Sequence, residues 1–317
     1  MARFAFAPLG RLLSALVTLV LVVVIVFGIV DTLVDPAALA LGQVAAPEEL
    51  ARLRAAWGLD RPWTTRLGEL LLGLASFDLG FSRVQSQAVS GLIARAFAPT
   101  LAYALPGMVL ATFAGIGGGL AAARRSGGII DRSLTAAATL LISTSSLIIV
   151  IAGHQIFAHR LGLFPIIGWP LVGSSVGAAG LLILPVFLWA LLQLGPDLRH
   201  YRALFVRELA EPYLDGLRSR GIRERAVLGH ALRGASASIL ARLAGRLPHL
   251  VVGSLVIEQV FNIPGVGGLA IVALQSGDLA LVEGLAVVLA LITVVGQLLL
   301  EFAAAAIDPR LRQRGDR

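Results

Sequence analysis

The sequence predicts an all-α integral membrane protein with six transmembrane helices, both termini in the cytoplasm, and a helical cytoplasmic segment between the fourth and fifth helices. Three observations lead to this fold class: composition, apolar segments of membrane-spanning length, and the distribution of arginine. Of the 317 residues, 57% are hydrophobic and 14% are charged, and the mean hydropathy is +0.86. Soluble domains carry about 25% charged residues, so this composition indicates a membrane protein.

Six segments are long and apolar enough to cross a bilayer, whose hydrocarbon core of about 30 Å takes roughly 20 residues of helix. They are residues 12–34, 100–123, 134–157, 176–194, 247–261 and 284–307. The fifth is short. The first resembles a signal peptide because "ALA" at 38–40 is similar to a cleavage site, but its uncharged run exceeds the usual 7–15 residues. We therefore interpret it as a membrane anchor.

Arginine supplies all 26 basic residues and sets the predicted orientation. With both termini inside, 19 of the 26 arginines lie in cytoplasmic segments. The positive-inside rule therefore places both ends in the cytoplasm. The net charge of +7 follows from these membrane-flanking arginines, so we do not expect nucleic-acid binding.

Residues 35–98 form the only sizeable non-membrane region predicted on the extracytoplasmic side. Pro47 suits a first helical position, leucines at 50 and 53 and Trp57 recur at helical spacing, and Gly58 suits the stop. This pattern predicts one amphipathic surface helix.

The second predicted span contains the small-residue stretch "GIGGGLAAA". Small residues allow helix backbones to approach closely in lipid, so this stretch predicts close helix packing, with a pore constriction as the alternative.

The cytoplasmic segment 196–246 contains "EPYLDGLRSRGIRERAVLGHALRGA", which is too polar to cross a bilayer. Pro212 favours a helix start and Gly221 a helix end, after which helical periodicity resumes. The spacing predicts a helix of about nine residues with Tyr213, Leu214 and Leu217 on one face and a basic rim. Isolated helices this short are unstable in water, so we expect that face to pack on its own chain or on a second protein.

Two ionisable residues in predicted spans have functional and structural interpretations. Glu258 is a candidate for the transport pathway, because charged groups in lipid usually face protein or water. We favour a structural hydrogen-bonding role for it over direct substrate contact. His154 has no second ligand at helical spacing, so we expect no metal site there. Asp131 and Arg132 are expected to fix the first cytoplasmic loop.

Catalytic motifs are missing from the sequence. It contains no G-x-x-x-x-G-K-[ST] phosphate loop, no HExxH, no G-x-S-x-G and no cysteine. We therefore expect no enzymatic activity, no catalytic residues and no bound cofactor in this chain.

The chain resembles, nearly end to end, the permease subunits of ABC importers of the dipeptide, oligopeptide and nickel family. The resemblance rests on an ordered series of motifs rather than on one piece. They are "PEELARLRAAWGLDRP", "DLGFS" at 78–82, "VSGLIARAFAPTLAYAL", "GGGLAAARRSGGIIDR", "RLGLFP" at 160–165, "GSLVIEQVFNIPGVGGL" at 253–269 and "IDPRLR" at 307–312. One departure is "STSSL" at 143–147, which lacks the proline of the family's stretch.

The resemblance implies a single permease domain over residues 1–317, with the short helix of segment 196–246 docking into the ATP-hydrolysing subunit. The residues it assigns to this coupling helix are Tyr213, Leu214, Asp215, Gly216, Leu217, Arg218, Arg220, Gly221 and Arg223. It implies ATP and Mg on partner subunits. The implied partners are a second homologous permease, two ABC ATPases, an extracytoplasmic solute-binding protein and the lipid of a bacterial inner membrane.

Two rival interpretations remain from the sequence alone. A secondary transporter or channel would work without ATPases, but it predicts repeated halves and charges at mid-depth in the membrane. A membrane-embedded enzyme would require a cluster of His, Asp or Glu. Neither pattern is evident in the sequence.

Overall fold

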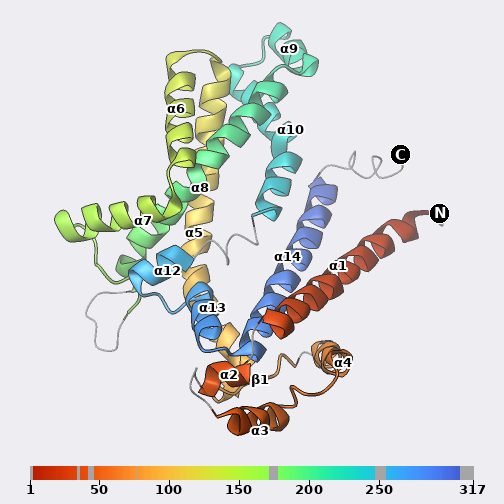
Figure 1. Ribbon diagram of the computed structural model, residues 1–317. Helices are drawn as coiled ribbons and strands as arrows, with labels where there is room; N and C mark the ends of the chain where they lie inside the picture. Colours follow the sequence, from red (N-terminus) through yellow and green to blue (C-terminus); the bar gives the residue numbers. More distant parts are fainter. Residues whose placement is uncertain are drawn as a thin grey trace. The chain divides into compact units, whose positions relative to one another are not determined.

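The computed structural model describes residues 3–33, 36–41, 46–76, 78–170, 178–246 and 255–307. Helices dominate these residues (Figure 1). The chain divides into two compact units. The first unit comprises Met1–Ala98 and Gly265–Val295, and the second comprises Pro99–Pro264 and Gly296–Arg317. The helical fold class is confirmed. We describe each unit by itself.

The first unit contains the predicted outer region. Its elements are α1 (Arg3–Leu33), α2 (Pro36–Leu41), α3 (Pro47–Trp57), α4 (Trp63–Ala75), β1 (Phe81–Ser82), β2 (Gln87–Ala88), the start of α5 (Val89–Arg124), α13 (Val266–Gln275) and most of α14 (Leu279–Ile307). The predicted amphipathic helix is confirmed as α3. It begins at Pro47 and ends before Gly58, whose φ of 69° is left-handed, a conformation that glycine adopts without steric cost.

A short antiparallel hairpin in the first unit was not predicted. β1 pairs with β2, and Ser86 in the turn has a φ of 51°. The Ser82 hydroxyl donates to the buried carboxylate of Asp278, which also accepts the backbone N–H of Leu281 at 3.3 Å. This carboxylate therefore caps the start of α14 and attaches the hairpin to it.

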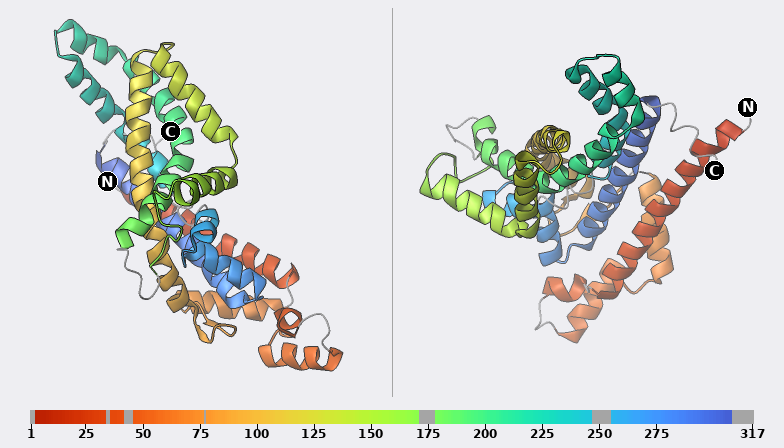
Figure 2. Two further views of the ribbon diagram at one scale, coloured as in Figure 1. Left: turned by 90° about the vertical axis from the view of Figure 1, so that its left-hand side faces the viewer. Right: turned by 90° about the horizontal axis from the view of Figure 1, so that it is seen from above.

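The second unit contains the remainder of α5 and the predicted cytoplasmic helices. Its other elements are α6 (Ile129–Ser143), α7 (Ser146–His154), the π-helix η1 (Gln155–Arg160), α8 (Ala178–Leu209), α9 (Pro212–Ser219), α10 (Glu224–Ala244), α12 (Leu255–Phe261) and the end of α14. Helices α8 and α10 pack together, and α9 lies at the tip where they are joined (Figures 1 and 2). The segment 196–246 is thus a helical hairpin.

The third predicted span, 134–157, is interrupted. Helix α6 and the following α7–η1 helix form an angle of 98°. The cause is local, because Thr144 and Ser145 have extended ψ values of 133° and 136°. This break lies in "STSSL", so the bend occurs here without a proline.

Helices α5 and α8 approach closely through the predicted glycine stripe. A Cβ at Gly118 would lie 2.5 Å from Leu198, and one at Gly119 would lie 2.7 Å from the backbone nitrogen of Arg202. A side chain at Gly119 would therefore collide with backbone, and one at Gly118 would require the Leu198 side chain to move. The small residues therefore serve close packing, the interpretation that the sequence favoured over a pore constriction.

Within the described residues, three helices are long and apolar enough to span a membrane, and two interrupted helix pairs would raise the number to five. The three are Val89–Arg124, Gly180–Leu209 and Leu279–Gly296, and Leu16–Ile29 is a shorter apolar helix. Several predicted boundaries lie outside the described residues. These are residue 34 of the first predicted span, residues 176–177 of the fourth, residues 247–254 of the fifth, and the tail at 308–317.

Candidate functional site

Helix α9 is built by local signals at both ends. Glu211 precedes it in extended conformation, and Pro212 occupies its first position, where the missing N–H has no helical partner to lose. At the other end Gly221 has a φ of 74°, and its N–H donates to the Arg218 carbonyl at 2.9 Å. The start and stop predicted for this helix are confirmed.

The apolar face of α9 is covered by its own chain. Leu214 is completely buried and packs against Val227 and Ala231 of α10. Leu217 is partly buried and packs against the same cluster. Of the two alternatives left open by the sequence, intramolecular packing is therefore correct for Leu214. This burial attaches the short helix firmly to α10.

Tyr213 lies apart from that buried face, contrary to the prediction, and it is 46% exposed. Its hydroxyl donates to Oε1 of Glu208 near the end of α8, at 2.7 Å. Burial and the Glu208 carboxylate raise the pKa of Tyr213 to about 12. The phenol is therefore neutral at physiological pH and remains able to donate this bond.

The opposite side of α9 is polar and exposed. Arg218 pairs with Asp215 at 2.8 Å and approaches Glu224 at 3.6 Å. Arg220 and Arg223 are exposed and have no ion pair within the described part of the chain. Gly216 and Gly221 are also exposed, and a Cβ at either would meet no atom within 4 Å. Thus all nine predicted residues lie on or next to α9. Leu214 and Leu217 pack on α10, and the other seven are exposed.

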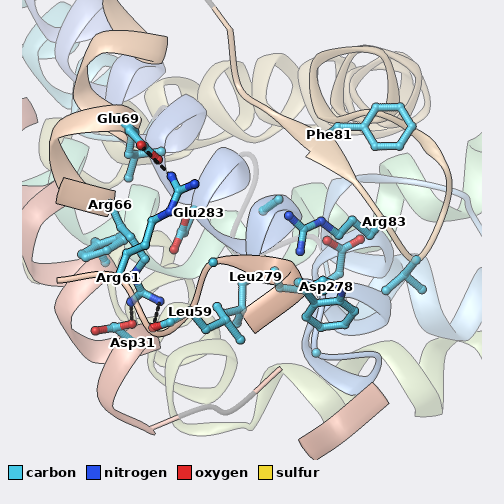
Figure 3. A pocket seen from close by; sticks show the side chains of 18 of the residues that line it. Asp31, Leu59, Arg61, Arg66, Glu69, Phe81, Arg83, Asp278, Leu279 and Glu283 are labelled. Atoms are coloured by element: carbon cyan, nitrogen blue, oxygen red, sulfur yellow. Dashed lines mark hydrogen bonds and ion pairs between the residues drawn. The ribbon is translucent and has the colours of Figure 1, made fainter. Parts of the chain in front are cut away.

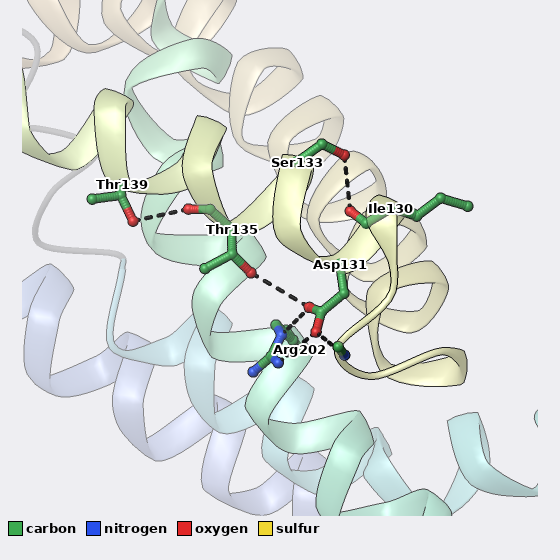
Figure 4. A network of polar contacts seen from close by, with 7 residues as sticks. Ile130, Asp131, Ser133, Thr135, Thr139 and Arg202 are labelled. Carbon is green, nitrogen blue, oxygen red and sulfur yellow. Dashed lines mark hydrogen bonds and ion pairs between the residues drawn. The ribbon is translucent and has the colours of Figure 1, made fainter.

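A polar network joins α6 to α8 in the same unit (Figure 4). Arg202 donates to both carboxylate oxygens of Asp131, with 2.8 Å between its terminal nitrogen and Oδ2. The N–H of Gly127 also donates to this carboxylate, at 2.7 Å. Asp131 therefore fixes the loop between α5 and α6, as predicted. Its partner Arg202 is 71 residues away, and no sequence signal connected the two.

Glu258 is almost completely buried in α12, with 1% of its surface exposed. It accepts hydrogen bonds from the Thr100 hydroxyl at 2.7 Å and the Tyr103 hydroxyl at 3.2 Å, both on α5. A buried carboxylate with two donors joins two helices. This geometry fits the structural interpretation of Glu258 better than direct contact with a substrate.

His154 likewise has structural contacts. Its Nε2 lies 3.0 Å from the Ile166 carbonyl, and its ring makes edge contacts with His159 and Phe261. Among the described residues, no group of three or more His, Asp or Glu could hold a metal ion.

The first unit contains a pocket of about 540 Å³, which the sequence did not predict (Figure 3). Its charged lining residues are Asp31, Arg61, Arg66, Glu69, Arg83, Asp278 and Glu283. Arg66 pairs with Asp31, Arg61 pairs with Glu69 at 3.0 Å, and the Arg83 guanidinium lies over Trp57. The lining comes from four distant parts of the chain, which explains why sequence patterns gave no indication of it. Most of its charge is already paired internally.

Two family models match the chain. The model described as "Binding-protein-dependent transport system inner membrane component" matches residues 115–313, and the corresponding N-terminal model matches residues 1–104. The first match includes the hairpin of α8, α9 and α10 together with Glu258.

Full-length relatives give the same result. A putative peptide transport system permease protein of Brucella abortus (strain 2308) is 34% identical over 307 residues, which is 96% of this chain and 98% of the relative. The glutathione transport system permease protein GsiC of Pectobacterium atrosepticum is 30% identical over 312 residues, and that of Salmonella choleraesuis 31% over 314 residues. Each of these two matches also covers 96% of this chain and 98% of the relative.

Proposed function

The chain belongs to the family of binding-protein-dependent transport system inner membrane components, and we propose from this premise how it carries out transport. It is a permease subunit of an ABC importer. In our proposal it lines the translocation pathway for a small solute, and ATP hydrolysis on partner subunits drives the change of access. The observation that carries the proposal is the hairpin of α8, α9 and α10, which presents an exposed polar helix at its tip.

The proposed topology has six spans, with both termini on the cytoplasmic side of a bacterial inner membrane. Three long helices, two interrupted helix pairs and the apolar Leu16–Ile29 supply six candidates. The arginine distribution supports the orientation. In this topology residues 35–98 lie outside the cell membrane and α9 lies in the cytoplasm.

Helix α9 is the proposed coupling helix. Leu214 and Leu217 hold it on α10, while Tyr213, Asp215, Gly216, Arg218, Arg220, Gly221 and Arg223 form the surface for an ATPase. Arg220 and Arg223 have no ion pair within the described residues, so an acidic groove could pair with both. A helix attached in this way transmits a displacement to α8 and α10 without entering lipid.

The proposed assembly contains this chain, a second homologous permease, two ATPase subunits that bind ATP and Mg, and an extracytoplasmic solute-binding protein. The chain itself binds no cofactor in this proposal. Because the relatives are named as peptide and glutathione transport permeases, we propose a peptide or a similar small solute as the substrate. Glu258 supports the pathway from within the α5–α12 contact.

The test is reconstitution of the complete importer in liposomes, with uptake and co-purification of the ATPase measured for Gly221→Asp. Aspartate at this exposed position adds a negative charge beside Arg220 and Arg223. We expect it to abolish uptake and weaken ATPase association while the permease remains folded. Gly221→Asn is the matched control, because asparagine also tolerates the left-handed conformation but adds no charge. It should retain most of the association.

Unchanged uptake by Gly221→Asp would contradict the docking assignment. Uptake by the purified chain alone, without ATP or partner subunits, would contradict the importer function as a whole.

A further inference from the structure

A buried charge pair closes the hairpin of α8, α9 and α10 at the end opposite α9. Asp197 lies at the start of segment 196–246, and Arg246 lies at its end. Arg246 Nη1 donates to Asp197 Oδ2 at 2.5 Å, and the two side chains are 4% and 0% exposed respectively. The pair therefore joins two points that are 49 residues apart, on either side of the proposed coupling helix.

Arg246 is held by more than this carboxylate. Its second terminal nitrogen donates to the side-chain oxygen of Gln193 at 3.2 Å, and Nη1 lies 3.5 Å from the Thr112 hydroxyl on α5. These contacts fix the guanidinium in one orientation. Arg246 thus connects the end of α10 to α8 and to α5 within the same unit.

A second arginine, Arg242, lies one helical turn before Arg246. Its Nε is 3.5 Å from Asp197 Oδ1, and neither of these two buried atoms has a hydrogen-bond partner in the described chain. Arg242 is 31% exposed, in contrast to the buried Arg246. The contact with Arg246 is therefore the dominant one, and Arg242 contributes a longer-range attraction.

Burying an ion pair is a poor way to gain stability, because desolvation of the two charges offsets their attraction. Well-packed apolar residues of similar volume usually stabilise as well or better. A buried pair does, however, define one alignment of the helices that carry it, because either charge left alone in the interior is unfavourable. Its position at the open end of a hairpin makes alignment the relevant property.

Helix α8, which carries Asp197, is itself held in place by its neighbours α5 and α6. A Cβ at Gly115 of α5 would lie 2.7 Å from the Cβ of Asp197, so the two backbones are in close contact there. Five residues further along α8, Arg202 is bound to Asp131 of α6. Helix α8 is therefore held by α5 and α6, whereas α10 is held at its far end by the Asp197–Arg246 pair.

We propose that Asp197 is a positioning residue for transport, which acts through Arg246 to keep the end of α10 aligned on α8. A displacement of α9 then moves α8 and α10 together and reaches the membrane-embedded helices. Without the pair, α10 shifts on α8 and the displacement is lost within the hairpin. The inference rests on the proposed coupling role of α9.

The test uses the complete importer in liposomes and compares uptake with ATPase activity for Asp197→Asn and Arg246→Gln. We expect ATPase activity to persist while uptake per ATP falls roughly tenfold. A factor of ten corresponds to about 1.4 kcal/mol, which lies within the range by which mutations change the coupling between sites in other proteins. Arg242→Gln, in the last turn of α10, is the matched control. It should lower uptake per ATP much less, because its contact with Asp197 is longer.

The variant Asp197→Leu/Arg246→Leu separates alignment from stability. It should regain the thermal stability lost in the single variants without regaining uptake per ATP. Recovery of both would overturn the proposal, as would a parallel loss of uptake and ATPase activity in the single variants. If Asp197→Asn fails to assemble, Arg246→Lys and Arg246→Gln decide the matter. The lysine variant should retain more coupling, and equal losses would overturn the proposal.

A direct measurement of alignment is possible because the sequence contains no cysteine. Spin labels on cysteines introduced at the exposed Ala203 of α8 and Ala241 of α10 report the distance between the helices. We expect a narrow distribution in the parent chain and a broad one with Asp197→Asn. Equal widths would overturn the proposal. If uptake by the parent importer in liposomes did not depend on ATP, that result would instead contradict the importer function.

Discussion

The Tyr213 hydroxyl donates a hydrogen bond to Glu208, and this bond lies directly over Gly234 of α10. A Cβ at Gly234 would fall on the Glu208 carboxylate and 2.9 Å from the Tyr213 oxygen. The bond thus joins the end of α8 to the start of α9 across a position where an added Cβ would displace the Glu208 carboxylate. Two contacts therefore hold α9 in place: the exposed hydrogen bond from Tyr213 to α8 and the buried packing of Leu214 on α10.

Gly234→Ala should break this bond, because the added methyl group displaces the Glu208 carboxylate. Gly229→Ala is the matched control on the same helix, since a Cβ there would meet no atom within 4 Å. The control should stabilise the chain by about 0.5–1 kcal/mol through helix propensity. Gly234→Ala should be less stable than the control by about 1 kcal/mol, the value of one hydrogen bond. Denaturant unfolding in detergent measures the difference, and equal stabilities would contradict the assignment.

The same bond predicts a pH dependence. The pKa of Tyr213, about 12, lies above the ordinary value of 10.0, so folding favours the neutral phenol. Its contribution to stability is therefore complete below pH 10 and is lost as the pH rises toward 12. We expect the stability difference between the parent chain and Tyr213→Phe to stay constant up to about pH 10 and to decline between about pH 10 and pH 12. A difference that stays unchanged between pH 10 and pH 12 would contradict the raised pKa.

Elements with local signals were predictable from the sequence. Pro47 with Gly58 delimited α3, and Pro212 with Gly221 delimited α9, because the fixed φ of proline and the left-handed freedom of glycine act within a single helix end. The break between α6 and α7 had only a weak signal, since Thr144 and Ser145 interrupt the helix without proline or glycine.

The contacts that organise the hairpin were not predictable in this way. Arg202 pairs with Asp131, which is 71 residues away in the sequence, and Arg246 pairs with Asp197, which is 49 residues away. Such pairings depend on how the helices pack, which a periodic pattern does not specify. The same limit of sequence patterns applies within α9. Helical spacing predicted that Tyr213 shares the buried face of Leu214, but Tyr213 is exposed and bonds to Glu208 of α8 instead.

Asp131→Asn should destabilise the contact between α6 and α8. Asparagine retains one carbonyl oxygen but loses the charge and one of the two acceptors that Arg202 uses. We expect a clear fall in the free energy of unfolding, because hydrogen bonds to a charged group contribute more to stability than neutral ones. Arg132→Gln, at the exposed neighbouring position, should change stability by less than about 0.5 kcal/mol. Similar effects of the two substitutions in a thermal unfolding assay would contradict the assigned role.

Glu258 offers a test between its two interpretations. If its function is to accept hydrogen bonds from Thr100 and Tyr103, Glu258→Gln should keep most of the stability and most of the uptake, because the amide oxygen still accepts. Glu258→Leu should lose about 2–3 kcal/mol, since it leaves both buried hydroxyls without this acceptor. Uptake should then fall in step with the folded fraction. If instead Glu258 contacts the substrate, Glu258→Gln will raise the KM for uptake while its unfolding temperature stays at the parent value. We expect the first result, because 99% of the Glu258 surface is already covered by the chain itself.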